Sequence, residues 1–151
     1  MNTTFDNDSG VRRLNWLPLI AMVIALIGLG DAIYLTYHHY MAEPVPCSIT
    51  GGCEMVLASE YATFYDIPIA LFGAIAYFDA FLFALLTFSG RWGMWWLFGA
   101  QVTLMAAFSG WLIYVQANYI HAFCQFCLLS AATSITLFFI FLLSLVLSRR
   151  S

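Results

Sequence analysis

Four long apolar runs alternate with short polar stretches along the 151-residue chain. Each run has roughly the 20 apolar residues that an α-helix needs to cross the hydrocarbon core of a bilayer. A segment in lipid must satisfy its backbone N–H and C=O groups internally, which favours helices for runs of this length. The pattern therefore predicts an all-α integral membrane protein, a bundle of four transmembrane helices with spans at about residues 16–37, 67–88, 92–115 and 123–147.

Two polar segments lie outside these runs. Residues 1–15 predict a disordered cytoplasmic tail and not a signal peptide, because the following apolar run is too long and has no small-residue cleavage site. Residues 41–66 form one long loop between the first two spans. Within it, residues 53–61 predict a short amphipathic helix with Met55, Val56 and Leu57 touching the membrane. Residues 16–151 are expected to form a single membrane domain.

The composition agrees with insertion into a membrane. Hydrophobic residues make up 63% of the chain and charged residues 9%, whereas soluble domains carry roughly a quarter charged residues. No nucleic-acid partner is expected. With four spans, all the arginines fall on one side, which the positive-inside rule makes cytoplasmic; they are Arg12, Arg13, Arg91, Arg149 and Arg150. Both termini are then cytoplasmic, and the long loop faces outward.

All four cysteines fall on the outward side. Cys47 and Cys53 lie in the long loop, and Cys124 and Cys127 lie at the head of the fourth run. Disulfides persist in oxidising compartments, and cysteines used only as small apolar residues would not all collect there. The even number, the common side and the two close pairs indicate thiol–disulfide chemistry.

The Cys-x-x-Cys pair stands at the start of the fourth predicted helix. Its thiols are one helical turn apart, and the positive end of the helix dipole favours the thiolate. Cys127 lies about 4.5 Å deeper than Cys124, at three residues of 1.5 Å rise. We therefore expect Cys124 to exchange with a loop cysteine and Cys127 to meet an acceptor in the bilayer. The predicted electron path leads from an external dithiol through Cys47, Cys53, Cys124 and Cys127 to a quinone.

The loop sequence fits this path. Pro46 holds its neighbour Cys47 in an extended segment, and Gly51 and Gly52 supply a flexible turn before Cys53. A disulfide between the two loop cysteines is sterically easy across this turn. The glycines would also let Cys53 leave Cys47 and reach the Cys-x-x-Cys pair.

Alternative roles stay open for the same residues. The cysteines could form structural disulfides in a four-span scaffold without turnover, or hold zinc with His38, His39 or His121, although we expect no metal site. DsbB-like enzymes are a second kind of quinone-dependent thiol oxidase. They carry Cys-x-x-Cys in the first external loop and the spaced pair in the second, the reverse of the order found here.

Two aspartates lie within predicted spans, where an ionisable side chain is costly and suggests a function. Asp31 and Asp79 are predicted at similar depths and could share a proton on a route to the reduced quinone. Hydrogen bonds to Ser, Thr or Tyr of neighbouring helices are the alternative.

Several short sequences closely resemble the vitamin K epoxide reductase (VKOR) family in its bacterial branch. They cover nearly the whole chain in order and spacing, which a lone Cys-x-x-Cys would not do. The sequences are Cys47-Ser-Ile-Thr-Gly-Gly-Cys53, Ser59-Glu-Tyr-Ala, Ile67-Pro68-Ile-Ala-Leu-Phe72-Gly73 and Cys124-x-x-Cys127-Leu-Leu-Ser130-Ala131.

The resemblance implies a quinone-dependent thiol–disulfide oxidoreductase. Bacterial members reoxidise a periplasmic thioredoxin-like protein and pass the electrons to a quinone (ubiquinone, menaquinone or phylloquinone), which supports disulfide formation in exported proteins. By position, Cys47 would meet the partner, Cys53 would relay to Cys124, and Cys127 would contact the quinone.

The resemblance also implies four further site residues. Ser59 matches a hydroxyl residue near the active site of the family. Positions that line the quinone pocket in relatives are matched by Leu57, Phe72 and Leu112.

The chain departs from its relatives at two points. Animal members bind vitamin K through an Asn and a Tyr, whose positions match Ile69 and Ala131 here, so quinone reduction is expected and epoxide reduction is not. Some bacterial members carry a fused thioredoxin-like domain, whereas this sequence stops at Ser151. We therefore expect a stand-alone form in the bacterial inner (plasma) membrane with a separate DsbA-like partner.

Overall fold

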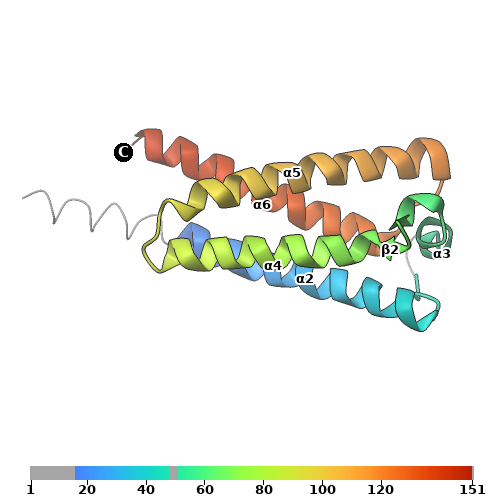
Figure 1. The fold of residues 1–151 in the computed structure, drawn as a ribbon. Helices are drawn as coiled ribbons and strands as arrows, with labels where there is room; N and C mark the ends of the chain where they lie inside the picture. The colour runs from blue at the N-terminus through green and yellow to red at the C-terminus, as the bar shows by residue number, and fades with distance from the viewer. Residues whose placement is uncertain (1–15, 48–50, 151) are drawn as a thin grey trace, which may run out of the picture.

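The computed structural model describes residues 16–47 and 51–150, so the predicted tail, residues 1–15, lies outside the described residues. Four long helices run up and down in a four-sided bundle (Figure 1): α2 (Trp16–Met41), α4 (Ile69–Phe88), α5 (Met94–Val115) and α6 (Gln125–Arg150). Neighbours pack in the order α2, α4, α5 and α6, and α6 closes the bundle against α2. All four helices are long and apolar enough to cross a membrane, which confirms the predicted fold class.

The two ends of the bundle differ (Figure 1). At one end, here called the terminal end, α2 begins, α4 turns into α5, and α6 finishes. The opposite end, here called the cysteine end, carries the short elements that connect the long helices. These are α3 (Cys53–Leu57), the 3₁₀-helix η1 (Glu60–Ala62), β1 (Thr63–Phe64), β2 (Ile67–Pro68) and the π-helix η2 (Gln116–Ile120).

The helix boundaries differ from the expected ones for local reasons. α2 continues four residues beyond the predicted end at residue 37, because no proline occurs between that residue and Pro44. α4 begins at Ile69, where Pro68 occupies the N-cap in an extended conformation. Proline has no N–H to donate, so it suits the entry of a helix better than its interior.

Gly90 ends α4. It has φ +107°, a conformation that L side chains rarely adopt. The N–H groups of Gly90 and Arg91 donate to the carbonyl oxygens of Thr87 and Leu86, each at 3.0 Å. This is the Schellman pattern, which satisfies carbonyls at the end of a helix and here reverses the chain into α5.

A small hairpin that the sequence analysis did not predict leads into α4. β1 and β2 pair antiparallel, with Thr63 opposite Pro68 and Phe64 opposite Ile67. The two residues between the strands, Tyr65 and Asp66, have φ of 51° and 63°. Positive φ at both central residues is what a type I′ turn requires.

The predicted amphipathic helix is shorter than residues 53–61. α3 covers five residues and is followed by η1. Met55 is exposed as expected, but Val56 is buried with Cys53 on the inner face, so its predicted contact with the membrane is wrong. Residues three apart share a helix face, which explains why Val56 follows Cys53 inward.

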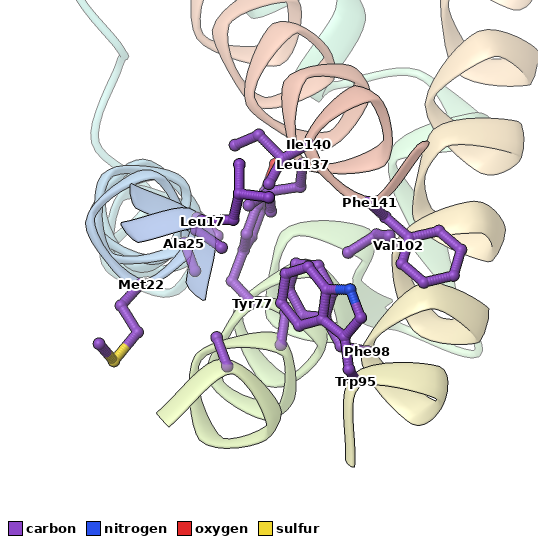
Figure 2. Packing of buried hydrophobic residues seen from close by; sticks show 14 of the residues in the cluster. Leu17, Met22, Ala25, Tyr77, Trp95, Phe98, Val102, Leu137, Ile140 and Phe141 are labelled. Carbon is purple, nitrogen blue, oxygen red and sulfur yellow. The ribbon is translucent and has the colours of Figure 1, made fainter. Parts of the chain in front are cut away.

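The larger of the two buried apolar clusters lies mainly in the terminal half of the bundle (Figure 2). The rings of Trp95 and Phe98 stack with centroids 4.5 Å apart. Phe141 from α6 lies directly against Gly99, where a Cβ atom would overlap its ring. The indole N–H of Trp95 donates to the hydroxyl of Ser144 at 2.7 Å.

Tyr77 also belongs to this buried cluster. It is 1% exposed, and its ring lies over Gly28 of α2, where a Cβ atom would overlap it. Its hydroxyl reaches α6 and lies 2.8 Å from the hydroxyl oxygen of Ser134. Tyr77 therefore ties three helices together just below the cysteine end.

Candidate active site

The loop cysteines form a disulfide, with their Cα atoms 5.9 Å apart. Cys53 is the first residue of α3 and is fully buried. Cys47 is half-buried and follows Pro46, which is exposed. The disulfide thus joins a residue that is partly open to solvent to one that faces the protein interior.

Cys53 and Cys124 belong to the same small buried cluster, against which Cys47 and Cys127 pack. Gly52 makes this approach possible, because a Cβ atom there would lie 2.7 Å from the carbonyl oxygen of Phe123. Gly52, which the sequence predicts as part of a flexible turn, therefore also allows a close approach to the backbone of Phe123. The structure brings the four cysteines into one region of the cysteine end.

Cys124 occupies the N-cap of α6, directly before the first residue of the fourth span. Its Sγ accepts a hydrogen bond from the backbone N–H of Cys127 at 3.4 Å. Its carbonyl oxygen accepts from the N–H of Leu128 at 2.9 Å. The sulfur thus takes the position from which side chains satisfy the free N–H groups of the first helical turn.

The pKa of Cys124 is lowered from 9.0 to about 7. The largest cause is the hydrogen bond from the Cys127 thiol, and the backbone N–H groups of Cys127 and Phe126 lower it further. Burial and the negative charge of Asp31 act in the opposite direction. Cys124 is therefore the cysteine outside the span that carries thiolate character near neutral pH, the form that attacks disulfides.

Gln116 holds the segment before α6 in place, and sequence reasoning missed it. It is buried, and its Oε1 accepts a hydrogen bond from the N–H of Cys124 at 3.1 Å. Its backbone oxygen accepts from the N–H of Ala122 at 3.2 Å. Gln116 begins η2, and π-helical turns occur frequently at functional sites. The only signal in the sequence is one Gln at the end of an apolar run.

A cavity of about 790 Å³ lies among α4, α5 and α6, beneath α3 and η1. Its wall includes the predicted residues Leu57, Ser59, Phe72, Leu112 and Cys127. Cys47, Cys53 and Cys124 are not among its lining residues. The structure therefore divides the cysteines: Cys124 shares a buried cluster with the loop pair, and Cys127 reaches the cavity.

Three matched positions around the cavity have distinct surroundings. The hydroxyl of Ser59 donates to the carbonyl oxygen of Val56 at 2.6 Å, which leaves only its lone pairs for a ligand. Ile69 and Ala131 also line the cavity. Their side chains are apolar, so neither supplies a side-chain hydrogen bond to a ligand.

Four hydroxyl side chains, here called the hydroxyl cluster, meet at the α4–α6 side of the cavity. Tyr77 lies within hydrogen-bond distance of the hydroxyl oxygens of Ser130 (3.1 Å), Thr133 (2.6 Å) and Ser134 (2.8 Å). Tyr77, Ser130 and Ser134 line the cavity, as Cys127 does. The sequence motif contained Ser130, but Tyr77 is 53 positions away in the chain, so the cluster was not predicted.

The two aspartates within the spans do not share a proton. Asp31 is 8% exposed, and neither of its carboxylate oxygens has a hydrogen-bond partner among the described residues. Asp79 is half-exposed and lies off the buried face of α4, which contains Tyr77 and Ala80. Of the two readings that the sequence left open, the described residues support neither for Asp31, because it makes no hydrogen bond to Asp79 or to a Ser, Thr or Tyr side chain.

The described residues do not support the alternative of a zinc site. Within residues 16–47 and 51–150, no three His, Cys, Asp or Glu side chains come together to hold a metal ion. His38 instead lies 3.8 Å from a carboxylate oxygen of Glu43.

Two comparisons with known proteins agree with this arrangement. The sequence model of the vitamin K epoxide reductase family matches residues 19–142. The chain is also similar to the thiol-disulfide oxidoreductase LTO1 of Arabidopsis thaliana, with 33% identity over 123 residues. The aligned part covers 73% of this chain and 32% of LTO1, so the chain spans about a third of the length of that relative.

Proposed function

The chain belongs to the vitamin K epoxide reductase family, and on that premise we propose that it is a quinone-dependent thiol–disulfide oxidoreductase. It oxidises the dithiol of a soluble thioredoxin-like protein and delivers the electrons to a quinone in the membrane. In this way it supports disulfide formation in exported proteins.

The division of the cysteines between two surroundings carries the proposal. Cys124 lies in the buried cluster of Cys53, whereas Cys127, one helical turn deeper, lines the cavity. A structural disulfide needs neither a second thiol pair beside it nor a cavity at its far side. A relay needs both, because electrons must enter from one side and leave from the other.

Each exchange step is the attack of a thiolate on a disulfide sulfur. A partner thiolate attacks Cys47, breaks its bond to Cys53 and forms a mixed disulfide. The second partner thiol then releases Cys47, which leaves the partner oxidised and the loop pair reduced.

The inner exchange passes the two electrons to the Cys-x-x-Cys pair. The Cys53 thiolate attacks Cys124 of the inner disulfide and releases Cys127. Cys47 then attacks Cys53, restores the loop disulfide and leaves Cys124 and Cys127 as thiols. The structure has this arrangement, with the loop disulfide formed and the inner cysteines free.

The cavity fits the headgroup of a quinone. Small-molecule sites are concave and mostly apolar, with a few polar groups that fix orientation. The side chains of Leu57, Phe72 and Leu112 supply apolar walls, and the hydroxyl cluster supplies a polar patch beside Cys127. A bound quinone accepts two electrons and two protons and becomes a hydroquinone as the bond between Cys124 and Cys127 forms.

The charge distribution supports one orientation. Arg91 and Arg149 lie at the terminal end of the bundle, and cytoplasmic loops carry the excess of Lys and Arg. We place the terminal end in the cytoplasm and the cysteine end in the periplasm of a bacterium. Cys47 then meets a DsbA-like partner in an oxidising compartment.

Quinone absorbance tests the proposal. Purified protein, fully reduced in detergent, should reduce about two equivalents of a short-tail quinone, because each of the two cysteine pairs holds two electrons and the loop pair passes its electrons to the inner pair. Cys127→Ser should abolish this reaction. The matched variant Cys47→Ser should still carry it out once a small dithiol has reduced the inner pair. No reduction by folded wild-type protein would overturn the proposal in favour of a scaffold with structural disulfides.

A further inference from the structure

The hydroxyl cluster contains more partners than one tyrosine can bond. The Tyr77 oxygen lies against four oxygens of α6: the backbone carbonyl of Ser130 and the hydroxyls of Ser130, Thr133 and Ser134. A phenol has one hydrogen to donate and two lone pairs, so it makes three hydrogen bonds. Tyr77 therefore cannot bond all four neighbours at once, and the Thr133 hydroxyl has a second partner, since it donates to the Ser130 carbonyl at 2.8 Å.

The Ser130 hydroxyl is the one that Tyr77 holds most weakly. Its contact with Tyr77 is the longest, at 3.1 Å, whereas those of Thr133 and Ser134 are 2.6 and 2.8 Å. Thr133 and Ser134 are buried, but Ser130 is half-exposed. Its hydroxyl has no other hydrogen-bond partner in the part of the chain that the structure describes. Because its contact with Tyr77 is the longest and Ser130 lines the cavity, this hydroxyl can turn its hydrogen from Tyr77 to a ligand.

Ser130 also lies at a chemically useful place. It follows Cys127 by three residues on α6, so the two side chains share a helix face about 4.5 Å apart along the axis. Both line the cavity. A carbonyl oxygen bonded by Ser130 would thus belong to a ring held within one helical turn of the Cys127 sulfur.

The other polar groups in the deep part of the cavity are less well placed. Gln101 and Ser109 lie on α5, on a different wall from Cys127. Gln101 is 14 positions before Val115, about 21 Å from the upper end of α5 at 1.5 Å per residue. Gln116 already bonds the N–H of Cys124.

We infer that Ser130 donates a hydrogen bond to a carbonyl oxygen of the electron acceptor and so orients its ring beside Cys127. Tyr77 is a positioning residue, because it holds the hydroxyl cluster in place across the α4–α6 interface. This inference rests on the function proposed above. The Ser130 hydroxyl supplies the hydrogen bond to the acceptor that the apolar side chains of Ile69 and Ala131 do not supply.

Two readouts test the role of Ser130 without turnover. The first is the equilibrium dissociation constant of a short-tail quinone, measured by titration of the oxidised full chain in detergent. The second is the infrared carbonyl stretch of the bound quinone, isotopically labelled at its carbonyls, because a hydrogen bond lowers this frequency. The steady-state KM for the quinone, measured during turnover, supplements these two readouts.

Ser130→Ala should weaken binding about threefold to tenfold, the range of one neutral hydrogen bond. The carbonyl band should return toward the frequency of the free quinone. Ser130→Thr keeps the hydroxyl and should restore both readouts. Tyr77→Phe should give a smaller loss, since it removes the support of Ser130 and not the donor.

The matched control is Ser144→Ala. It removes the hydroxyl that accepts from Trp95, a buried hydrogen bond from an aromatic side chain to an α6 serine outside the cavity. This variant should bind the quinone like the wild type even if it is less stable.

The failures are distinguishable. If wild-type protein neither binds nor reduces the quinone, the proposed function is overturned together with this inference. If the wild type does both and Ser130→Ala matches it in dissociation constant and carbonyl band, only the role of Ser130 is overturned. A loss found in Gln101→Leu and not in Ser130→Ala would assign the donor to α5 and also overturn it.

Discussion

The two halves of the bundle use the same helices for opposite purposes. In the terminal half, Gly99 lets the ring of Phe141 lie flat against α5, and Trp95 stacks on Phe98. In the cysteine half, the same helices separate around a cavity of about 790 Å³. Close packing stabilises a helix pair in a membrane, where no hydrophobic force drives association. Close packing in the terminal half therefore stabilises the whole bundle. Side chains of the cysteine half can then line a cavity instead of filling the core.

Two glycines of α5, one in each half, give the largest expected contrast. A Cβ atom at Gly99 would overlap the ring of Phe141, whereas one at Gly110 would meet nothing within 4 Å. Gly99→Ala should lower the free energy of unfolding by about 1–3 kcal/mol through overpacking. Gly110→Ala should be neutral or stabilising by up to about 1 kcal/mol through helix propensity. Thermal unfolding in detergent, followed by circular dichroism, measures both.

Equal losses in the two variants would break the comparison, because they would show that both halves are packed to the same tolerance. If the halves differ as described, the folded fraction of Gly99→Ala should retain wild-type quinone reduction. Its defect is then one of stability alone.

Asp31 should give the next largest effect, with the opposite sign. Its carboxylate oxygens are buried without a hydrogen-bond partner among the described residues. Burying a polar group unpaired costs about 1–3 kcal/mol in mutational data. Asp31→Leu should therefore raise the free energy of unfolding by up to that amount, and Asp31→Asn, which keeps an unpaired polar group, should raise it less. Chemical denaturation of both variants in detergent measures the difference.

The two possible outcomes for Asp31 show whether the cysteine half is less stable because it keeps a group needed for function. A more stable Asp31→Leu protein with slower quinone reduction would show stability exchanged for function. A loss of stability in Asp31→Leu would instead show that the carboxyl group supports the fold and would contradict the expectation.

The fold followed from the sequence because its signals are long and redundant. Each apolar run spans about 20 residues, so an error of a few residues at an end leaves the helix in place. The ends depend on single residues, such as Pro68 before α4 and Cys124 before α6. The hairpin was missed because Tyr65 and Asp66 are not the Asn-Gly pair that usually marks a type I′ turn.

The residues of the site also differ in how well the sequence predicts them. The four cysteines stand out by type and spacing, so the sequence predicts that they act together. Gln116 and Tyr77 are ordinary residues in apolar helices, and their importance lies in partners that the fold brings close, Cys124 and Ser130. No spacing rule within one helix connects residues on different helices. The role of each cysteine in the electron path stays a prediction.

The smallest expected effect is a shift in a titration midpoint, and it tests how the cysteine half sets the reactivity of Cys124. The pKa of Cys124 is lowered to about 7, chiefly by the hydrogen bond from the Cys127 thiol. In the reduced protein, the ultraviolet absorbance of the thiolate should therefore rise through a midpoint near pH 7. Below that pH Cys124 is a thiol and above it a thiolate. In the proposed relay Cys124 is the sulfur released when Cys47 attacks Cys53, and a low pKa makes it a better leaving group.

Three variants show which group is responsible. Cys124→Ser should lose the transition. Cys127→Ala removes the donor, so the midpoint of Cys124 should move up toward its ordinary value, while Cys127→Ser keeps an O–H donor and should hold the midpoint lower. A midpoint near pH 9 in the wild type would contradict the assignment. If Cys127→Ala and Cys127→Ser gave the same midpoint, the backbone N–H groups at the start of α6 would be the cause. Packing of the helix end, and not the second thiol, would then activate Cys124.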